Sequence, residues 1–327
     1  MFQKEIGIKR MKTKLTLSIT IILIFFFIFV STGFSGNLEV HFIDVGQGDS
    51  IFIITPNYKT ILIDAGIHSA ENDKRNPFIY IRDLKKEEKI KDLKIDAAFI
   101  THQHPDHYGG FKYLCKEREG GQDFSIDNVY YSVFKFKTYG GFRPCFESLI
   151  RKATFATQVF SHGPPVSPDP DVELKVLYPF QKINKRNPYR NDESMVLLLQ
   201  YQNIRFLFTG DASKEVERKL LDQDIQSNVL KLGHHGSWTA SDEEFLQKVK
   251  PLSGNFYAVI SSNDKDGRGK MASHPHKVTL ETLHRLGDVK LYRTDLYGTI
   301  VMVSDGSSVI VNTSNQREIS EKDLWKP

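Results

Sequence analysis

The sequence contains little that would cross-link or divide the folded chain. Its 327 residues include only two cysteines, Cys115 and Cys145, and neither stands in a CxxC motif or in another metal-ligand spacing. The two could form a disulfide in an oxidising compartment, and the alternative is a pair of small buried hydrophobic side chains. No low-complexity linker interrupts the chain after its N-terminal segment. We therefore expect one large globular domain rather than two.

Net charge is also absent from most of the chain. The whole sequence has a formal net charge of +4, and its first 36 residues alone carry five basic residues and one acidic residue. The rest of the sequence is therefore formally neutral. This balance argues against a protein that coats nucleic acid through a broad basic surface, and it leaves room only for a local basic patch.

A long apolar run occurs only at the N-terminus. Basic residues precede the uncharged run from Leu15 to Val30, and small residues follow it in "STGFSG". This order is typical of an export segment, and its length lies between those of a cleaved signal peptide and a membrane anchor. A buried core helix is the alternative, but apolar residues surround the whole helix. We predict a signal peptide or N-terminal membrane anchor over residues 1–36, which would contact the membrane if uncleaved, and an exported domain over residues 37–327.

Short β-rich runs separated by turn residues fill the exported part. Alternating apolar residues between Leu38 and Gly66 predict antiparallel strands with one buried face, and the continuous apolar run before Thr101 predicts a strand buried on both faces. Helices are expected at about Pro77–Asp92, Ser213–Asp222, Asp242–Val249 and Lys277–Leu286. Surface loops are expected at Phe134–Pro144 and Gly163–Asp171. The pattern predicts two packed sheets with helices outside.

Histidines gather where predicted strands end. The stretch "THQHPDHYGG" supplies His102, His104, Asp106 and His107 from one loop, and seven of the eleven histidines fall in this cluster, in the pair after "LKLG" and in "SHPH". Imidazole and carboxylate ligands delivered from a rigid strand end suit zinc or a similar divalent ion. Asp211 ends the apolar strand "IRFLFTGD", where its carboxylate could bridge two ions.

Several motifs together resemble a known family. "THQHPDHYGG" resembles the HxHxDH signature of the metallo-β-lactamase superfamily. In chain order, further motifs are similar to the metallo-hydrolase domain of the ComEC family of DNA-uptake proteins and its stand-alone relatives: "FIDVGQGDSIFI", "ILIDAG", "NDESMVLLLQY", "FLFTGD", "LKLGHHGS", "SHPH" and "YRTDLYGTIVM". The resemblance covers about Val40–Val303. It implies an α/β (α+β) fold, the four-layer αβ/βα sandwich, with a di-metal site at one edge.

The resemblance also implies a ligand set. His102 and His104 would hold the first metal, Asp106 and His107 the second, and Asp211 would bridge them. One histidine of "HHGS" should bind the second metal. We favour His234, and the alternative is His235, which could instead hydrogen-bond the substrate.

One position departs from the wider superfamily. Asn191 stands near the place where many members have another histidine ligand, and an amide oxygen binds zinc less well than imidazole does. Two divalent ions are expected, with zinc as the first choice. Because of Asn191, the first ion is expected to be weakly held, exchangeable or a harder ion such as manganese. His162 could replace the missing ligand, but its loop comes too early in the order of the motifs.

Two bound ions would generate a hydroxide nucleophile near neutral pH, which implies hydrolysis. Asp106 is expected to orient the attacking water, and Asp64 to support the ligand loop. A phosphoester substrate needs further contacts, for which His274 is the first candidate by resemblance. The other candidates are Ser237, which could instead cap a helix, Lys231 and Arg293.

Three functions compete. We favour an exported binuclear-metal hydrolase of phosphoester bonds, nuclease-like or phosphodiesterase-like, secreted or held at the outer face of the cytoplasmic membrane. Its substrate could be a nucleic acid, although the neutral charge weakens that reading, and no obligate protein partner is implied. A small ester, lactone, β-lactam or phosphorylcholine group is the second substrate class. The third function is a non-catalytic, metal-stabilised surface binding module.

Two related arrangements are disfavoured. No multi-spanning segment accompanies the domain, so we expect the hydrolase part without a DNA channel. A flavin-coupled di-iron reductase is also disfavoured, because "HQHPDH" lacks the glutamate expected of that branch.

Overall fold

The structure, a computed structural model, describes residues 36–67, 73–115, 123–132, 143–161, 163, 166–182, 190–263 and 274–327. The predicted leader lies outside these residues except for Gly36, as do the side chains of Cys115 and Cys145 and the whole of His162. Among the described residues, no helix has the length and apolar character needed to cross a membrane. The account below concerns the unit Asn37–Pro327.

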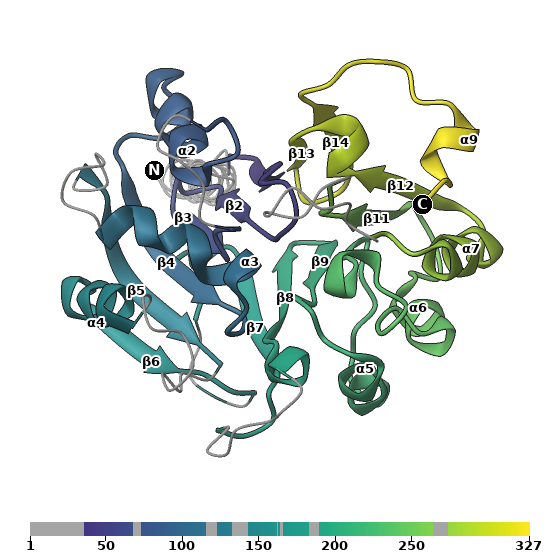
Figure 1. The fold of residues 1–327 in the computed structure, drawn as a ribbon, viewed down its shortest axis with the longest axis horizontal. Coiled ribbons are helices and arrows are strands. Elements are labelled where there is room, and N and C mark those ends of the chain that lie inside the picture. Colours follow the sequence, from purple (N-terminus) through teal and green to yellow (C-terminus); the bar gives the residue numbers. More distant parts are fainter. Residues whose placement is uncertain are drawn as a thin grey trace, which may run out of the picture. The chain divides into compact units, whose positions relative to one another are not determined.

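In the described part of the chain, eight strands form the first sheet, in the order β14-β13-β1-β2-β3-β4-β5-β6 (Figure 1). They are β1 (Leu38–Phe42), β2 (Ile51–Ile54), β3 (Thr60–Ile63), β4 (Lys94–Ile100), β5 (Ser125–Tyr131), β6 (Phe155–Gln158), β13 (Ile300–Ser304) and β14 (Val309–Thr313). Strands β1, β2 and β3 pair antiparallel, as the alternation predicts, whereas β3 to β6 run parallel. After Lys94, every residue of β4 is buried, which confirms the strand covered on both faces.

The second sheet has six strands within the described residues, in the order β12-β11-β10-β9-β8-β7. They are β7 (Glu173–Tyr178), β8 (Val196–Tyr201), β9 (Ile204–Phe208), β10 (Val229–Lys231), β11 (Phe256–Ile260) and β12 (Val289–Arg293). Strands β9 to β12 are parallel, so their carboxyl ends meet at one edge of the sheet.

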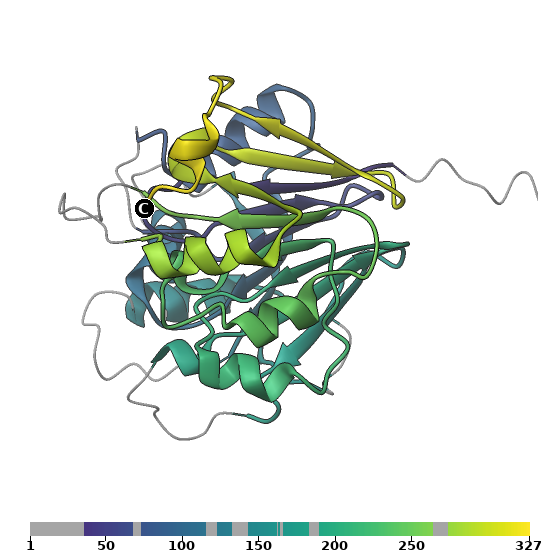
Figure 2. The ribbon, with the colours of Figure 1, turned by 90° about the vertical axis from the view of Figure 1, so that its right-hand side faces the viewer.

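Helices cover the outer face of each sheet. The first sheet carries α2 (Pro77–Lys86), α3 (Pro105–Tyr108), η1 (Gly109–Cys115) and α4 (Arg143–Lys152), and the second carries α5 (Lys214–Leu220), α6 (Glu243–Val249) and α7 (Lys277–Leu286). Figure 2 shows α5, α6 and α7 side by side over the second sheet. Apolar side chains of both sheets form the core between them. These layers confirm the predicted αβ/βα sandwich.

Local signals explain most helix boundaries. Asn76 caps α2 by accepting a hydrogen bond from Phe78 N at 3.0 Å, and Pro77 occupies the first turn, where no amide donor is needed. Helix α7 has the predicted bounds and ends at Gly287, whose φ of 65° suits glycine. The remaining short helices are η4 (Arg190–Glu193), η5 (Gly233–Gly236), α8 (Thr294–Tyr297) and α9 (Glu321–Leu324).

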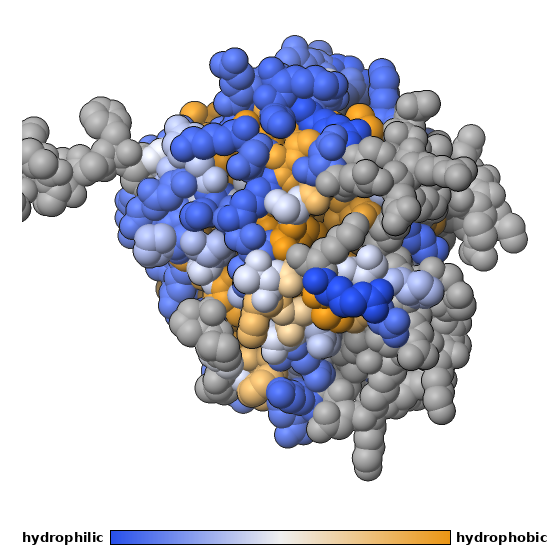
Figure 3. Space-filling view, turned by 90° about the vertical axis from the view of Figure 1, so that its left-hand side faces the viewer, coloured by the Kyte–Doolittle hydropathy of each residue, from blue (hydrophilic) through white to orange (hydrophobic). Residues whose placement is uncertain are grey.

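Two expected surface loops differ from the structure. Pro144 lies in α4 rather than in a loop, because the helix begins at Arg143 and buries Phe146 and Leu149 against the first sheet. In the second loop Val166 is 3% exposed, so part of that stretch belongs to the core. On the face turned to the viewer in Figure 3, hydrophilic residues cover most of the coloured surface and smaller hydrophobic areas lie between them.

Candidate metal centre

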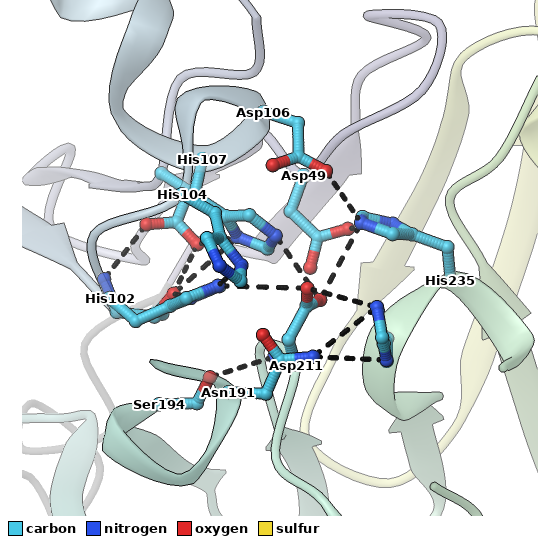
Figure 4. A network of polar contacts seen from close by, with 12 residues as sticks. Asp49, His102, His104, Asp106, His107, Asn191, Ser194, Asp211 and His235 are labelled. Atoms are coloured by element: carbon cyan, nitrogen blue, oxygen red, sulfur yellow. Dashed lines mark hydrogen bonds and ion pairs between the residues drawn. The ribbon is translucent and has the colours of Figure 1, made fainter. Parts of the chain in front are cut away.

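The candidate ligands lie on loops that follow buried strands (Figure 4). His102 and His104 follow β4, and Asp106 and His107 lie on α3 immediately afterwards. Asp211 follows β9, with its backbone N–H donating to Ser194 Oγ at 3.1 Å. The "HHGS" segment follows β10 as η5. Strands from both sheets therefore bring the candidate metal ligands to one place.

Among the described residues, three groups of side chains have the spacing of metal ligands, and two of them share Asp211; the third is Asp49, Asp64 and His107. Asp106, His107, Asp211 and His235 can each offer one atom within 4.8 Å of the others, and the same holds for His102, His104 and Asp211. His102 Nε2 lies 2.9 Å from His104 Nδ1. These sets correspond to a second and a first metal position, respectively, with Asp211 common to both.

Asp211 faces both groups because its two carboxylate oxygens point in different directions. Oδ1 lies 3.1 Å from His107 Nε2 and 3.5 Å from His235 Nε2. Oδ2 lies 3.6 Å from His102 Nε2 and 3.8 Å from His234 Nε2. The Asp211 side chain is 2% exposed, so both oxygens act inside the protein. This is the geometry of a bridging carboxylate.

The donor set fits a divalent cation. His107 Nε2, Asp211 Oδ1 and His235 Nε2 are buried and have no hydrogen-bond partner among the described residues. Burial opposes a charge on either imidazole, yet the surrounding carboxylates outweigh it, raising the pKa of His107 well above its usual value and that of His235 to about 10. The pocket therefore stabilises positive charge at the point where unpaired ligand atoms converge.

His235, rather than His234, lies in the four-residue group. The sequence favours His234 for this place. Both residues have left-handed backbone, with φ of 49° and 55°, so the chain turns sharply between them. His234 Nδ1 contacts Thr239 Oγ1 at 2.8 Å, and its ring reaches only the Oδ2 side of Asp211. The backbone turn separates two neighbouring histidines onto two sides of one carboxylate.

Asn191 lies on η4 beside the His102 group without completing it. Its Nδ2 is 3.1 Å from His234 Nδ1, and its buried Oδ1 has no hydrogen-bond partner in the described part of the chain. The first metal position is thus provided with two imidazoles, a carboxylate and a nearby unpaired amide oxygen. This set is weaker for zinc than the second one.

Asp64 supports His107, as the sequence suggests for this aspartate. Its Oδ2 lies 2.7 Å from His107 Nδ1 and accepts a hydrogen bond from Thr101 Oγ1 at 2.6 Å. Thr101 N also donates to Asp64 Oδ1 at 2.8 Å. A carboxylate behind a ligating histidine fixes which ring nitrogen faces the metal.

Asp49 is a second buried carboxylate beside a candidate ligand, and it was not predicted from the sequence. Its Oδ2 lies 2.8 Å from Lys231 Nζ and its Oδ1 lies 3.3 Å from His235 Nδ1. The hydrogen bond of His235 Nδ1 is to the Ser261 carbonyl oxygen, at 2.9 Å. Lys231 is fully buried in this ion pair, so the prediction that it contacts substrate phosphate is wrong. Asp49 lies in the motif "FIDVGQGDSIFI", next to Gly48. Gly48 in fact allows close approach, because a Cβ there would lie 2.3 Å from the carbonyl oxygen of Asp106.

The remaining substrate candidates differ in position. Arg293 is 4% exposed and pairs with Asp295 at 2.7 Å, so it cannot reach a substrate. The Ser237 hydroxyl is buried against Thr239. His274 does lie at the rim, with its ring centroid 5.4 Å from that of His234.

His274 is held as a neutral imidazole. Gln47 Nε2 lies 3.4 Å from His274 Nδ1. Burial, followed by the neighbouring imidazoles, lowers the pKa of His274 to about 4. A neutral ring at the rim can donate or accept one hydrogen bond to a bound group.

Comparison with known proteins identifies the domain. A family profile described as the metallo-β-lactamase superfamily matches residues 43–121. ComE operon protein 3 of Bacillus subtilis is 31% identical over 282 residues, which are 80% of this chain and 32% of that protein. Competence protein ComA of Neisseria gonorrhoeae is 29% identical over 260 residues, 79% of this chain and 31% of that protein. The chain carries a metallo-β-lactamase domain.

A solved structure agrees with the fold of this metallo-β-lactamase domain. The metallo-β-lactamase fold protein YhfI from Bacillus subtilis has a TM-score of 0.50 and 13% identity, covering 82% of this chain and 100% of that chain. The chain spans about a third of the length of the curated relatives it matches. This chain therefore carries a metallo-β-lactamase domain that is similar in sequence to ComEC-like proteins, with groups of side chains spaced to hold divalent metal ions.

Proposed function

We propose that this protein is a metal-dependent hydrolase that cleaves phosphoester bonds, as an exported phosphodiesterase with two divalent ions. The observation that carries the proposal is the orientation of Asp211, whose two oxygens face two separate ligand groups. Two ions on one bridging carboxylate suit an in-line displacement at phosphorus, because they can stabilise both the attacking and the leaving oxygen. The resemblance of the motifs to those of DNA-uptake proteins supports a nucleic acid as one such substrate.

The exposure of the ligands indicates the substrate side. The side chain of Asp106 is 27% exposed and that of His234 24%, whereas those of His107 and His235 are at most 1% exposed. A substrate therefore approaches past Asp106 and His234, with His274 at the same rim. Divalent ions held here would supply an activated water and neutralise charge at the attacked phosphorus.

The residues of the chain would share the remaining tasks. Asp106 has one oxygen, Oδ2, 3.3 Å from His235 Nε2, and its exposed edge can orient the attacking water and accept its proton. His274, neutral at physiological pH, can hydrogen-bond the phosphoryl or leaving oxygen. Asp49 and Asp64 hold His235 and His107 in orientation from behind.

We also propose that the domain works outside the cytoplasm. The support is the basic-then-apolar order of residues 1–36. If the segment is cleaved, the hydrolase would be secreted. If it is retained, the hydrolase would be held at the outer face of the cytoplasmic membrane. The ligand groups found among the described residues all come from one chain, so the proposal includes no obligate protein partner.

Hydrolysis of bis-p-nitrophenyl phosphate and of a chromogenic cephalosporin by the full chain tests the proposal. We expect turnover of the diester, and a loss of roughly 100-fold or more in Asp106→Ala, because that residue both binds metal and handles the proton. Asp222→Ala, an exposed aspartate after α5, is the matched control and should keep wild-type activity. Activity on the cephalosporin alone, or an Asp106→Ala variant as active as wild type, would contradict the proposal.

A further inference from the structure

Trp238 is a large, exposed aromatic residue on the loop that follows the candidate metal ligand His235. It follows His235 by three residues and is 58% exposed. Its neighbour Thr239 is fixed on both sides, because Oγ1 lies 2.8 Å from His234 Nδ1 and the carbonyl accepts a hydrogen bond from Lys214 N at 2.9 Å. The backbone beneath Trp238 is therefore held while its ring remains available to solvent.

A second loop connects Trp238 to the substrate side of the centre. His276 N donates to Gly236 O at 3.0 Å, and Trp238 N donates to His276 Nδ1 at 3.4 Å. The ring centroids of His274 and His276 are 4.7 Å apart, and those of His274 and His235 are 6.1 Å apart. A series of imidazole rings thus leads from the metal ligand His235, through His274, to His276, which accepts the backbone N–H of Trp238.

Cationic side chains are absent from the described residues of these two loops, Gly233–Ser241 and His274–His276. The next residue, Lys277, has its Nζ 3.6 Å from the Glu281 carboxylate. The described residues of these two loops therefore offer no lysine or arginine of their own to a phosphate. The exposed indole face offers stacking instead, which accepts any planar base.

We propose that Trp238 is a stacking subsite for the nucleobase next to the phosphodiester bond that the metal centre cleaves. The inference rests on the proposed phosphodiesterase function and names its substrate as an unpaired nucleotide. A duplex fits less well, because its bases are already stacked on one another. His274 lies beside the metal ligand His235, and His276 accepts the Trp238 backbone N–H, so one loop contacts both residues.

Fluorescence tests the subsite without turnover. The chain has two tryptophans, so Trp325→Phe leaves Trp238 as the only one. We expect thymidine 5′-monophosphate to quench the fluorescence of this full-length variant with saturation, and ribose 5-phosphate and choline phosphate, which lack a base, to bind roughly tenfold more weakly. Equal quenching by ribose 5-phosphate, or tighter binding of choline phosphate, would overturn the proposal.

Equilibrium dialysis of matched variants provides a second test of the subsite. Trp238→Ala should bind thymidine 5′-monophosphate about tenfold more weakly, and Trp238→Phe should recover most of the affinity, because it restores a ring. Tyr58→Ala removes an aromatic side chain that is 61% exposed on the β2–β3 turn and should bind as wild type does. Unchanged affinity in Trp238→Ala would refute the subsite.

The two proposals fail separately. A chain that binds thymidine 5′-monophosphate through Trp238 but cleaves no phosphodiester would refute the proposed function and leave the base-binding site standing. A chain that cleaves the dinucleotide TpT with no dependence of KM on Trp238 would refute the subsite alone.

Discussion

The two oxygens of Asp211 divide the centre, and the conformation of single residues decides which ligand stands on which side. His234 and His235 are adjacent, yet their left-handed backbone sends one ring toward Oδ2 and the other toward Oδ1 of Asp211. Residue types at strand ends were enough to predict a divalent metal centre. The choice between two neighbouring histidines depends on φ and ψ, which no pattern of residue types encodes.

Substitution of each histidine in turn tests this assignment. His235→Ala removes one of the four ligands of the second group, so its metal affinity should fall by more than the roughly 10–100-fold that loss of a supporting partner costs. His234→Ala, the matched variant, should keep the second ion because its ring lies outside that group. Metal content after dialysis, measured by mass spectrometry, distinguishes them. Loss of the second ion from His234→Ala but not from His235→Ala would contradict the structure.

At the scale of elements, Glu217 on α5 holds the start of α6. Its buried carboxylate accepts hydrogen bonds from Ser241 N at 2.7 Å and from Asp242 N at 2.9 Å. Burial is the largest influence and raises the pKa of Glu217 from 4.5 to about 7. Because the folded pKa exceeds the unfolded one, this group contributes stability fully below pH 4.5 and loses it as the pH rises to about 7.

Glu217→Gln should remove this pH dependence. The free energy of unfolding of wild type, minus that of the variant, should fall by up to about 3 kcal/mol between pH 4.5 and pH 7. Urea unfolding at a series of pH values measures the difference, with exposed Glu244→Gln on α6 as the control. A difference that stays flat or increases over this range would show that burial does not govern Glu217.

Long periodic elements could be predicted from the sequence, and short ones could not. The pattern around α7 predicted its bounds, because apolar positions recur at helical spacing and Gly287 ends the helix. Strand β6 was not predicted, because its four residues are exposed or only partly buried and show little alternation of apolar and polar side chains. Asp49 escaped for a similar reason: a single polar residue in a turn gives no periodic signal, and only the fold brings it to Lys231 and His235.

At the scale of the whole domain, the centre exists only where two sheets meet. The first sheet delivers the HxHxDH loop after β4, and the second delivers Asp211 and His235 after β9 and β10. The buried Asp49–Lys231 ion pair joins the same two halves beside the ligands. Family resemblance predicted the layers, but the contacts across the sheets depend on packing that the motifs alone do not describe. Metal binding should therefore be coupled to the association of the two halves.

The metal content of the full chain and of Asp211→Ala tests the bridging carboxylate most directly. We predict about two divalent ions per wild-type chain and fewer than one in the variant, because both ligand groups share Asp211. The exposed Asp222→Ala variant should keep the wild-type content. An Asp211→Ala chain that retains as much metal as wild type would contradict a shared carboxylate at the centre.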